Sequence, residues 1–344
     1  MSADLKVVQW ATGNIGLKAL REVINHPAMT LAGVHVYGAD KIGRDAGELC
    51  GVTPIGVRAT GRIEDVLALS PDCVLYMPRT FDVDDVCRLL ESGINVVATC
   101  GQFHHPASMD PQLRDRVETA CRAGGASVHS TGSSPGFISE ALPLVLTSTQ
   151  RRLDGLVIEE NADLSKRHSP ELLFDVMGFG RDLAPFDQFR ADYLAASFGP
   201  SLLLLADAVG LPLQQVTARG ELAATPQEVH IAAGTLKAGT VAAQRITVAG
   251  MRDGQELLTF RATWYCAADL EPAWEVRETG WHVSVAGDAP LEVTLRMPIP
   301  LERMAETTPG YTANRAVNVV AAVCAARPGI RSTLDLPPVA AQFA

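Results

Sequence analysis

The sequence predicts an α/β protein in which a doubly wound parallel sheet is followed by an α+β domain with a mainly antiparallel sheet. Two observations lead to this fold class. Residues 1–150 alternate short apolar, β-branched runs with amphipathic helical segments, which indicates parallel strands joined by helices. Beyond about residue 150 the segments become longer and alternate polar with apolar residues, which is typical of antiparallel strands.

The first domain is predicted to contain five strands with helical crossovers. The expected strands are 5–10, 31–37, 73–77, 95–99 and 127–130. The expected helices are 17–24, 61–69, 83–91 and 111–123. Ligands of such sheets collect at the carboxyl ends of the strands, so we expect the segments after Met77, Thr99 and Ser130 to meet at one site.

The second domain is predicted from period-two patterning. Its expected strands are 153–160, 216–222, 228–236, 240–251, 256–267 and 283–297, with a helix over 186–210. Asp253-Gly254 marks a hairpin turn. A final helix over 312–326 is expected to return to the first domain. The domains are therefore 1–150, completed by 305–344, and 151–304.

Composition restricts the classes of partner. The chain has 344 residues, 47% of them hydrophobic, and a formal net charge of -10 without a basic stripe, which argues against nucleic-acid binding. It shows neither an apolar stretch of membrane-spanning length nor a signal segment, so no membrane partner is expected. The seven cysteines are scattered, never in C-x-x-C spacing, and indicate reduced thiols of a cytoplasmic protein.

The segment between the first strand and the first helix carries the strongest motif. Residues 11–16 follow the pattern A-x-G-x-x-G, in which an alanine stands where the dinucleotide fingerprint has its first glycine. A glycine turn at a helix N-terminus suits a pyrophosphate because the backbone approaches closely and free N–H groups point at the anion. A plain βα turn is the alternative. The expected cofactor contacts are Ala11, Thr12, Gly13, Asn14, Ile15 and Gly16.

The end of the second strand selects between NAD and NADP. An NAD enzyme usually places a carboxylate there, but this chain has Tyr37-Gly38-Ala39, with Asp40 one step later. Lys41 and Arg44 follow and suit a 2′-phosphate, so NADP(H) is favoured and NAD(H) remains possible. Alternatively, both cations are solvated loop charges. The remaining cofactor contacts expected at the sheet edge are Tyr37, Met77, Pro78, Thr99, Cys100, Gly101 and Gly136.

Three stretches of the chain resemble the dihydrodipicolinate reductase-like proteins: 9–16, 33–51 and 131–137. They resemble most closely the branch of 2,4-diaminopentanoate dehydrogenase and the native amine dehydrogenases, and the endings 311–315 and 326–330 fit that branch. The resemblance implies a Rossmann domain, a substrate and dimerisation domain, and hydride transfer from NAD(P)H to a C=O or C=N carbon. It also implies a homodimer with a cleft between the domains, and Asn314 is counted among the cofactor contacts.

The segment after the fourth predicted strand departs from this family. Amine dehydrogenases carry a glutamate there that would bind ammonia and shuttle protons, whereas no carboxylate lies between Thr99 and Pro106 here. Gln102 stands in this segment and cannot take a proton near neutral pH. His104 and His105 are the local titratable groups, so the catalytic candidates are Gln102, His104 and His105.

Alternatives to this catalytic set remain. One histidine of the pair could pack while the other is solvated, and Glu159 or Glu160 could supply the acid. A catalytic thiol at Cys100 is a further alternative, and His168 is expected at the surface or in a lid. No Cys, His and carboxylate cluster completes a metal shell, so no metal is expected.

The substrate is expected to be a small, mostly apolar ketone or imine. Aromatic residues in the segments that could form the cleft suggest an apolar pocket, and residues 151–300 hold no basic cluster for a dicarboxylate. The alternative to a reductase is a catalytically lapsed NADP-binding protein that acts as a sensor or assembly partner.

Overall fold

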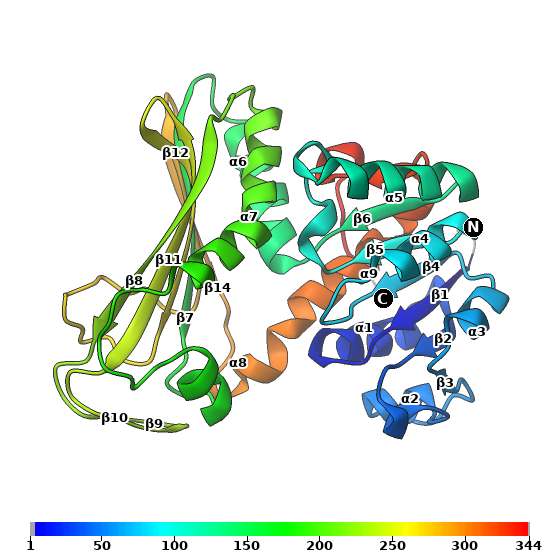
Figure 1. The fold of residues 1–344 in the computed structure, drawn as a ribbon, viewed down its shortest axis with the longest axis horizontal. Helices are drawn as coiled ribbons and strands as arrows, with labels where there is room; N and C mark the ends of the chain where they lie inside the picture. The colour runs from blue at the N-terminus through cyan, green and yellow to red at the C-terminus, as the bar shows by residue number, and fades with distance from the viewer. Residues whose placement is uncertain (1–3, 343–344) are drawn as a thin grey trace. The chain divides into compact units, whose positions relative to one another are not determined.

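The computed structural model describes residues 4–342, which divide into two compact units (Figure 1). Residues 138–307 form the second unit, and the described residues before and after them form the first. The first boundary therefore lies at 137/138, earlier than the expected 150. The reason is that α6 (Leu142–Thr147) packs against α7 (Gln188–Ala208) within the second unit.

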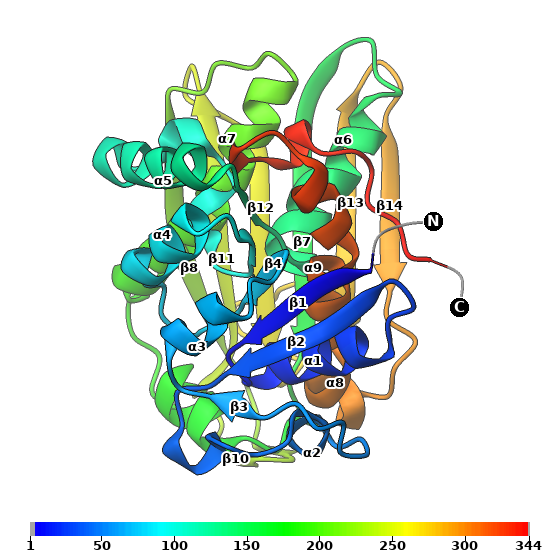
Figure 2. The ribbon, with the colours of Figure 1, turned by 90° about the vertical axis from the view of Figure 1, so that its right-hand side faces the viewer.

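The first unit is built on a seven-stranded parallel sheet (Figures 1 and 2). Its strands are β1 (Leu5–Trp10), β2 (Met29–His35), β3 (Ala59–Thr60), β4 (Cys73–Tyr76), β5 (Asn95–Ala98), β6 (Ser127–Ser130) and β15 (Gly329–Arg331). The spatial order β3-β2-β1-β4-β5-β6, followed by β15, is that of the Rossmann fold, with its switch point between β1 and β4. The predicted parallel sheet is confirmed, while β3 and β15 are too short to show a sequence pattern.

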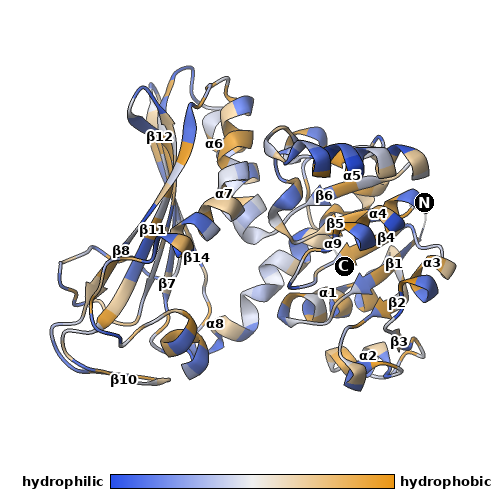
Figure 3. Cartoon of the chain, viewed as in Figure 1, coloured by the Kyte–Doolittle hydropathy of each residue, from blue (hydrophilic) through white to orange (hydrophobic). Residues whose placement is uncertain are grey.

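Helices cover both faces of this sheet. They are α1 (Asn14–Asn25), α2 (Ala46–Cys50), α3 (Ile63–Ala68), α4 (Val83–Glu91), α5 (Pro111–Gly124) and α9 (Pro309–Ala325). Alternate strand residues face opposite cores, so Val7 packs with the buried residues of α1 and α9, and Val8 with those of α4 and α5. Figure 3 shows the resulting contrast between the hydrophobic strands and the hydrophilic outer face of α5.

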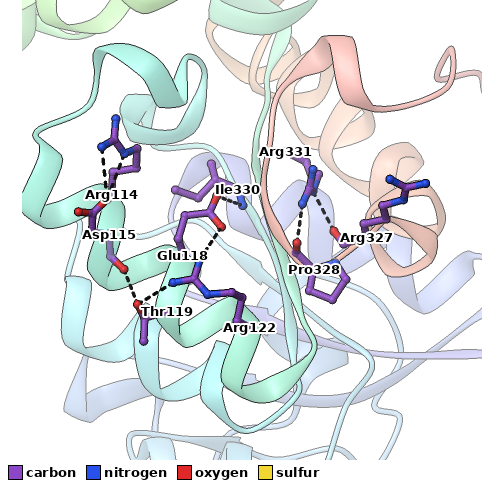
Figure 4. A network of polar contacts seen from close by, with 9 residues as sticks. All are labelled: Arg114, Asp115, Glu118, Thr119, Arg122, Arg327, Pro328, Ile330 and Arg331. Carbon is purple, nitrogen blue, oxygen red and sulfur yellow. Dashed lines mark hydrogen bonds and ion pairs between the residues drawn. The ribbon is translucent and has the colours of Figure 1, made fainter.

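The C-terminal segment completes the sheet beside β6 and makes polar contacts with α5 (Figure 4). The Ile330 amide donates to Glu118 Oε1 at 3.1 Å, and Arg122 pairs with the same carboxylate at 3.7 Å. His129 Nδ1 lies 2.7 Å from the Arg331 carbonyl oxygen. These two contacts join residues that are 212 and 202 positions apart in the chain.

The second unit contains a six-stranded mixed sheet. Its strands are β7 (Leu153–Asp163), β8 (Gln215–Ala224), β11 (Val241–Arg252), β12 (Gln255–Tyr265), β13 (Gly280–Gly287) and β14 (Leu291–Arg296). The order is β14-β13-β7-β12-β11-β8, and only the β7–β12 pair is parallel, so the sheet is mainly antiparallel as expected. Asp253 and Gly254, both with positive φ, form the predicted hairpin turn. A short helix, α8 (Leu301–Thr307), ends the unit.

Two predicted strands of this unit are wrong. Residues 228–236 form a separate hairpin of β9 (Val229–Ile231) and β10 (Gly234–Leu236), and 283–297 divides between β13 and β14. The alternation of polar and apolar residues continues through both reversals, so it does not reveal where the chain turns. Gly234, at φ +151°, permits the first reversal.

The two faces of the second sheet differ in character. One face packs on α7, where Phe198 stacks on Phe260 with ring centroids 3.7 Å apart. The opposite face is polar, and the strand register aligns one row of it across the sheet: Arg219, Thr247, Arg261, Glu159, His282 and Thr294.

Within residues 4–342 no helix is long and apolar enough to cross a bilayer.

Candidate cofactor and active site

The turn after β1 is tightly packed on its inner side and open on its outer side. Ala11 adopts φ +70°, and its amide donates to the His35 carbonyl oxygen at 2.9 Å. A Cβ on Gly16 would lie 2.2 Å from the Ala11 carbonyl oxygen, so this position requires glycine. A Cβ on Gly13 would meet nothing within 4 Å. The outer side therefore has room for a ligand against the backbone.

The first turn of α1 has the features of an anion site. Gly13 is its N-cap and offers no side-chain hydrogen bond, and no acidic residue stands in the first turn. The amides and the positive end of the helix dipole are therefore not compensated by the side chains of this turn. Together with the open space above Gly13, this arrangement fits the pyrophosphate of a dinucleotide.

Lys41 lies directly at this turn. It ends a short 3-10 helix, η1 (Ala39–Lys41), and its Nζ is 3.2 Å from both the carbonyl oxygen and Oγ1 of Thr12. The structure thus brings the predicted cation to the predicted phosphate turn, although the two are separated by 29 residues in the sequence.

Arg44 lies in a loop whose backbone is hydrogen-bonded to β3. Its carbonyl oxygen accepts from the Ala59 amide at 2.9 Å, and the Gly43 amide donates back to the Ala59 carbonyl oxygen at 2.8 Å. The neighbouring Asp45 is buried and accepts from three backbone amides, those of Gly47, Ile55 and Gly56. These hydrogen bonds hold the pKa of Asp45 below its usual value although burial opposes them. The Arg44 side chain itself is exposed.

Tyr37 belongs to an aromatic group at the ends of β1 and β2. Its hydroxyl accepts from Trp10 Nε1 at 2.9 Å, and Trp10 stacks on His35 with ring centroids 3.7 Å apart. Tyr37 is 60% exposed, so its ring is accessible to a ligand at this edge. Burial lowers the pKa of His35, which keeps that ring neutral near pH 7. Sequence reasoning missed His35, although it precedes Tyr37 by the two residues that place both on one side of an extended chain.

The segments after β4 and β5 contact each other at the same edge of the sheet. Met77 and Pro78 are buried, and Cys100 Sγ lies 3.9 Å from the Pro78 carbonyl oxygen. Burial raises the pKa of Cys100 to about 11. The group is therefore a neutral thiol near pH 7, which argues against a nucleophilic role.

Ser130 holds the loop that carries Gln102. Its Oγ donates to the Cys100 carbonyl oxygen at 2.6 Å and accepts from the Phe103 amide at 3.1 Å. Gly101–Phe103 forms a 3-10 turn between these two contacts. Gln102 is half-buried, and its Oε1 is buried with no hydrogen-bond partner within residues 4–342. The loop therefore offers an unused acceptor. Sequence reasoning missed Ser130, the last residue of β6.

His104 and His105 are both buried, with 2% and 7% of their surfaces exposed. The alternative in which one of the two rings is solvated is therefore wrong. The pair follows directly from the 3-10 turn of Gln102, so its backbone is fixed by the same loop. Their role in proton transfer stays a prediction.

Of the predicted cofactor contacts Gly136 and Asn314, Gly136 lies in the turn after β6, whereas Asn314 lies away from the glycine turn. Gly136 has φ +120°, which favours glycine, within the turn that follows β6. Ser133 in this turn hydrogen-bonds Thr312 of α9, with the two Oγ atoms 2.8 Å apart. Asn314 instead lines a surface hollow beside Glu22, Asn25 and His26, at the end of α1 opposite the glycine turn. The structure does not bring Asn314 to the turn.

The alternative acids of the second unit are engaged. Glu159 pairs with Arg261 at 2.9 Å and Arg277 at 3.4 Å, and Glu160 Oε2 accepts from Trp281 Nε1 at 3.0 Å. Both carboxylates therefore already have partners within the second unit. His168 is exposed. In the described part of the chain, no three His, Cys, Asp or Glu side chains are grouped as metal ligands.

Comparison with known sequences identifies related oxidoreductases. Residues 182–344 match the 2,4-diaminopentanoate dehydrogenase C-terminal domain. An amine dehydrogenase of Streptomyces virginiae is 29% identical over 97% of this chain and 96% of its own length. The 2,4-diaminopentanoate dehydrogenase of Acetoanaerobium sticklandii is 25% identical over 83% of this chain and 80% of its own.

Comparison with solved structures supports the fold. The amine dehydrogenase of Mycobacterium smegmatis superposes with a TM-score of 0.77, covering 99% of this chain and 98% of that one at 18% identity. A probable dehydrogenase of Thermotoga maritima gives a TM-score of 0.56 at 12% identity, covering 96% of this chain and 92% of that one.

Proposed function

This chain belongs to the dihydrodipicolinate reductase-like oxidoreductases, in the branch of 2,4-diaminopentanoate dehydrogenase and the amine dehydrogenases, and we propose that it reduces a C=O or C=N carbon with NAD(P)H. The observation that carries the proposal is the turn after β1. It combines open space above Gly13, an uncapped α1 N-terminus and Lys41 within 3.2 Å of Thr12.

The residues of this chain divide the work of the reaction. The nicotinamide, when bound, supplies the hydride. Residues 11–16 would hold the cofactor phosphates, and the buried Gln102 Oε1 would accept an N–H from the cofactor carboxamide or from a substrate nitrogen. His104 or His105 would deliver the proton that the reduced heteroatom needs. The remaining sheet-edge contacts stay as predicted: Met77, Pro78, Thr99, Cys100, Gly101 and Gly136.

NADP(H) is favoured over NAD(H), which remains possible. No carboxylate follows β2 at residues 37–39 to hold both ribose hydroxyls. Lys41 contacts Thr12 of the turn, and Arg44 stands three residues later in the chain. Asp40 is exposed on the same loop, and its carboxylate would favour NAD(H) if it held the ribose hydroxyls. The preference therefore depends on which of these side chains contacts the ribose.

The substrate is proposed to be a small, mostly apolar ketone or imine, reduced by a ketone or imine reductase or by an amine dehydrogenase-like reaction. The loop after β5 provides Gln102 where a proton-shuttling carboxylate would be needed, and an amide does not titrate near neutral pH. This loop therefore lacks the carboxylate base that the reaction with free ammonia would use.

A cofactor and substrate panel tests the proposal. The purified protein is incubated with NADPH or NADH and a series of ketones, with and without ammonium. Turnover without ammonium supports carbonyl reduction, and turnover only with ammonium supports amine formation. Tight cofactor binding without turnover favours the second candidate, a lapsed NADP-binding sensor or assembly protein, which the absence of the carboxylate also favours. Absence of cofactor binding overturns both.

The assembly is proposed to be a homodimer formed through the polar face of the second sheet. A face of six strands spans roughly 800 Å², which is about the area that each partner buries in a standard interface. The face carries charges of both signs, with Arg219 and Arg261 in the same row as Glu159, and a two-fold axis can place opposite charges of two such faces against each other. Sedimentation velocity should show a dimer, and a monomer at micromolar concentration would contradict it.

All seven cysteines are free thiols, which supports a cytoplasmic location.

A further inference from the structure

Gln9 is a fully buried amide beneath the cofactor turn. It is the penultimate residue of β1, and its Nε2 donates to the Ala11 carbonyl oxygen at 2.9 Å and the Trp10 carbonyl oxygen at 3.2 Å. The reversed amide would place Oε1 against two carbonyl oxygens, so this orientation follows from the hydrogen bonds.

The other end of this amide is unsatisfied. Gln9 Oε1 is buried and has no hydrogen-bond partner in the described part of the chain. A buried acceptor without a partner destabilises a fold, so an apolar side chain of the same length would serve packing better. We therefore expect the hydrogen bonds donated by Gln9 Nε2 to have a function that offsets the free-energy cost of the unpaired Oε1.

The donor fixes the direction of one peptide plane. Ala11 has φ +70°, which is uncommon for a residue other than glycine, and its carbonyl oxygen points inward to Gln9 Nε2 and to the space left by Gly16. In a trans peptide the C=O and N–H groups point in opposite directions. The Thr12 N–H therefore points away from Gln9, and it donates no hydrogen bond within residues 4–342.

We propose that Gln9 is a positioning residue of the cofactor site: by holding the Ala11 carbonyl inward, it presents the Thr12 N–H to a cofactor phosphate. The inference rests on the proposed function, because it requires a dinucleotide at this turn. Gln9 does not touch the cofactor and acts only through the Ala11–Thr12 peptide.

The first test replaces the donor with an apolar side chain of similar length. Gln9→Met should raise the Kd of NADH and of NADPH by the same factor, at least about tenfold, because both cofactors share the pyrophosphate. The kcat measured at saturating cofactor should stay within about twofold of wild type, because Gln9 affects how tightly the cofactor binds and does not touch the reacting atoms. Fluorescence titration gives both Kd values.

A matched control separates this role from stability. Gln244 is a fully buried glutamine of the second unit whose Nε2 donates to the Met177 carbonyl oxygen. Gln244→Met should lower the urea midpoint of unfolding and leave the Kd of NADH unchanged. If Gln244→Met weakens NADH as much as Gln9→Met, the effect is general destabilisation and the inference is overturned.

The second test makes the donor titratable. In Gln9→Glu the buried carboxyl has a raised pKa, donates to the Ala11 carbonyl oxygen when protonated, and repels it when ionised. The Kd of NADH should therefore rise from about pH 6 to about pH 8.5 in this variant and not in wild type. NADH is the probe because a 2′-phosphate itself titrates near pH 6. Circular dichroism confirms folding at both pH values.

The outcomes distinguish the two claims. If wild type binds neither cofactor, the proposed function fails. If wild type binds both cofactors and Gln9→Met binds them equally well, the inference on Gln9 fails while the function stands. If Gln9→Met does not fold, Gln9→Glu decides, and a Kd that does not change with pH overturns the inference.

Discussion

The turn after β1 and the loop after β5 lie at the same edge of one parallel sheet, and they are held by different means. In the turn, main-chain sterics decide the shape, because Gly16 has no space for a Cβ and Ala11 takes a left-handed conformation. In the loop, one side chain from the neighbouring strand, Ser130, holds the backbone on both sides of Gln102. Substitutions in the turn are therefore expected to disrupt its backbone. In the loop, Gln102 can be replaced by another side chain because Ser130 holds the backbone on both sides of it.

The largest expected effect separates two glycines of the turn. Gly16→Ala should unfold the turn or the protein, since its Cβ would lie 2.2 Å from the Ala11 carbonyl oxygen. Gly13→Ala should leave the melting temperature unchanged, because Gly13 has φ -77° and nothing within 4 Å of its Cβ. It should still weaken NADPH binding by at least about tenfold if phosphates lie there. Unchanged binding in Gly13→Ala would move the cofactor away from this turn.

The second effect concerns the exchangeable group of the loop. Gln102→Glu should confer or increase ammonium-dependent reduction of a ketone, because a carboxylate can hold ammonium and take its proton. Burial would raise the pKa of that carboxyl toward neutrality, and general-base catalysis contributes about 10²-fold or more. NADPH consumption with product identification measures it. His104→Ala and His105→Ala, assayed alongside, should lower the reductase activity of wild type.

The outcome that contradicts this prediction is specific. If wild type already forms amine at the rate of Gln102→Glu, with matched ammonium concentrations, the glutamine is not a defect. The loop after β5 would then hold a proton shuttle of a different kind.

The third effect tests the cations beside the turn. Changing Lys41 and Arg44 together to alanine should weaken NADPH more than NADH by at least about tenfold, because each charge-assisted contact contributes roughly 1.5–3 kcal/mol. Fluorescence titration of both cofactors measures the ratio. An equal loss for NADPH and NADH would show that Lys41, at 3.2 Å from Thr12, contacts the shared pyrophosphate instead.

The smallest effect concerns the clamp. Ser130→Ala removes the donor to the Cys100 carbonyl oxygen and the acceptor of the Phe103 amide, so it should lower kcat several-fold and destabilise the protein by about 1–3 kcal/mol. Ser127→Ala on the same strand is the control, because Ser127 Oγ donates to Arg327 at the opposite end of β6. Equal kcat losses in both variants would show that the loop has no special dependence on Ser130.

The sequence by itself determined the features that depend on neighbouring residues. The A-x-G-x-x-G turn, the strands around it and helices such as Val83–Glu91 follow from local spacing, capping and periodicity. The missing carboxylate after β5 was visible as well, since that absence is a property of one short segment.

Only the tertiary structure decided which distant side chains meet. Gln9 and Gly16 share the inner side of the turn, His35 stacks on Trp10, and Ser130 reaches the loop of Gln102, but no local pattern marks these pairs. The position of Asn314 beside the far end of α1 was decided in the same way. The physical reason is that burial and hydrogen bonding are satisfied across strands and helices, whereas periodicity reports only which face of its own element a residue occupies.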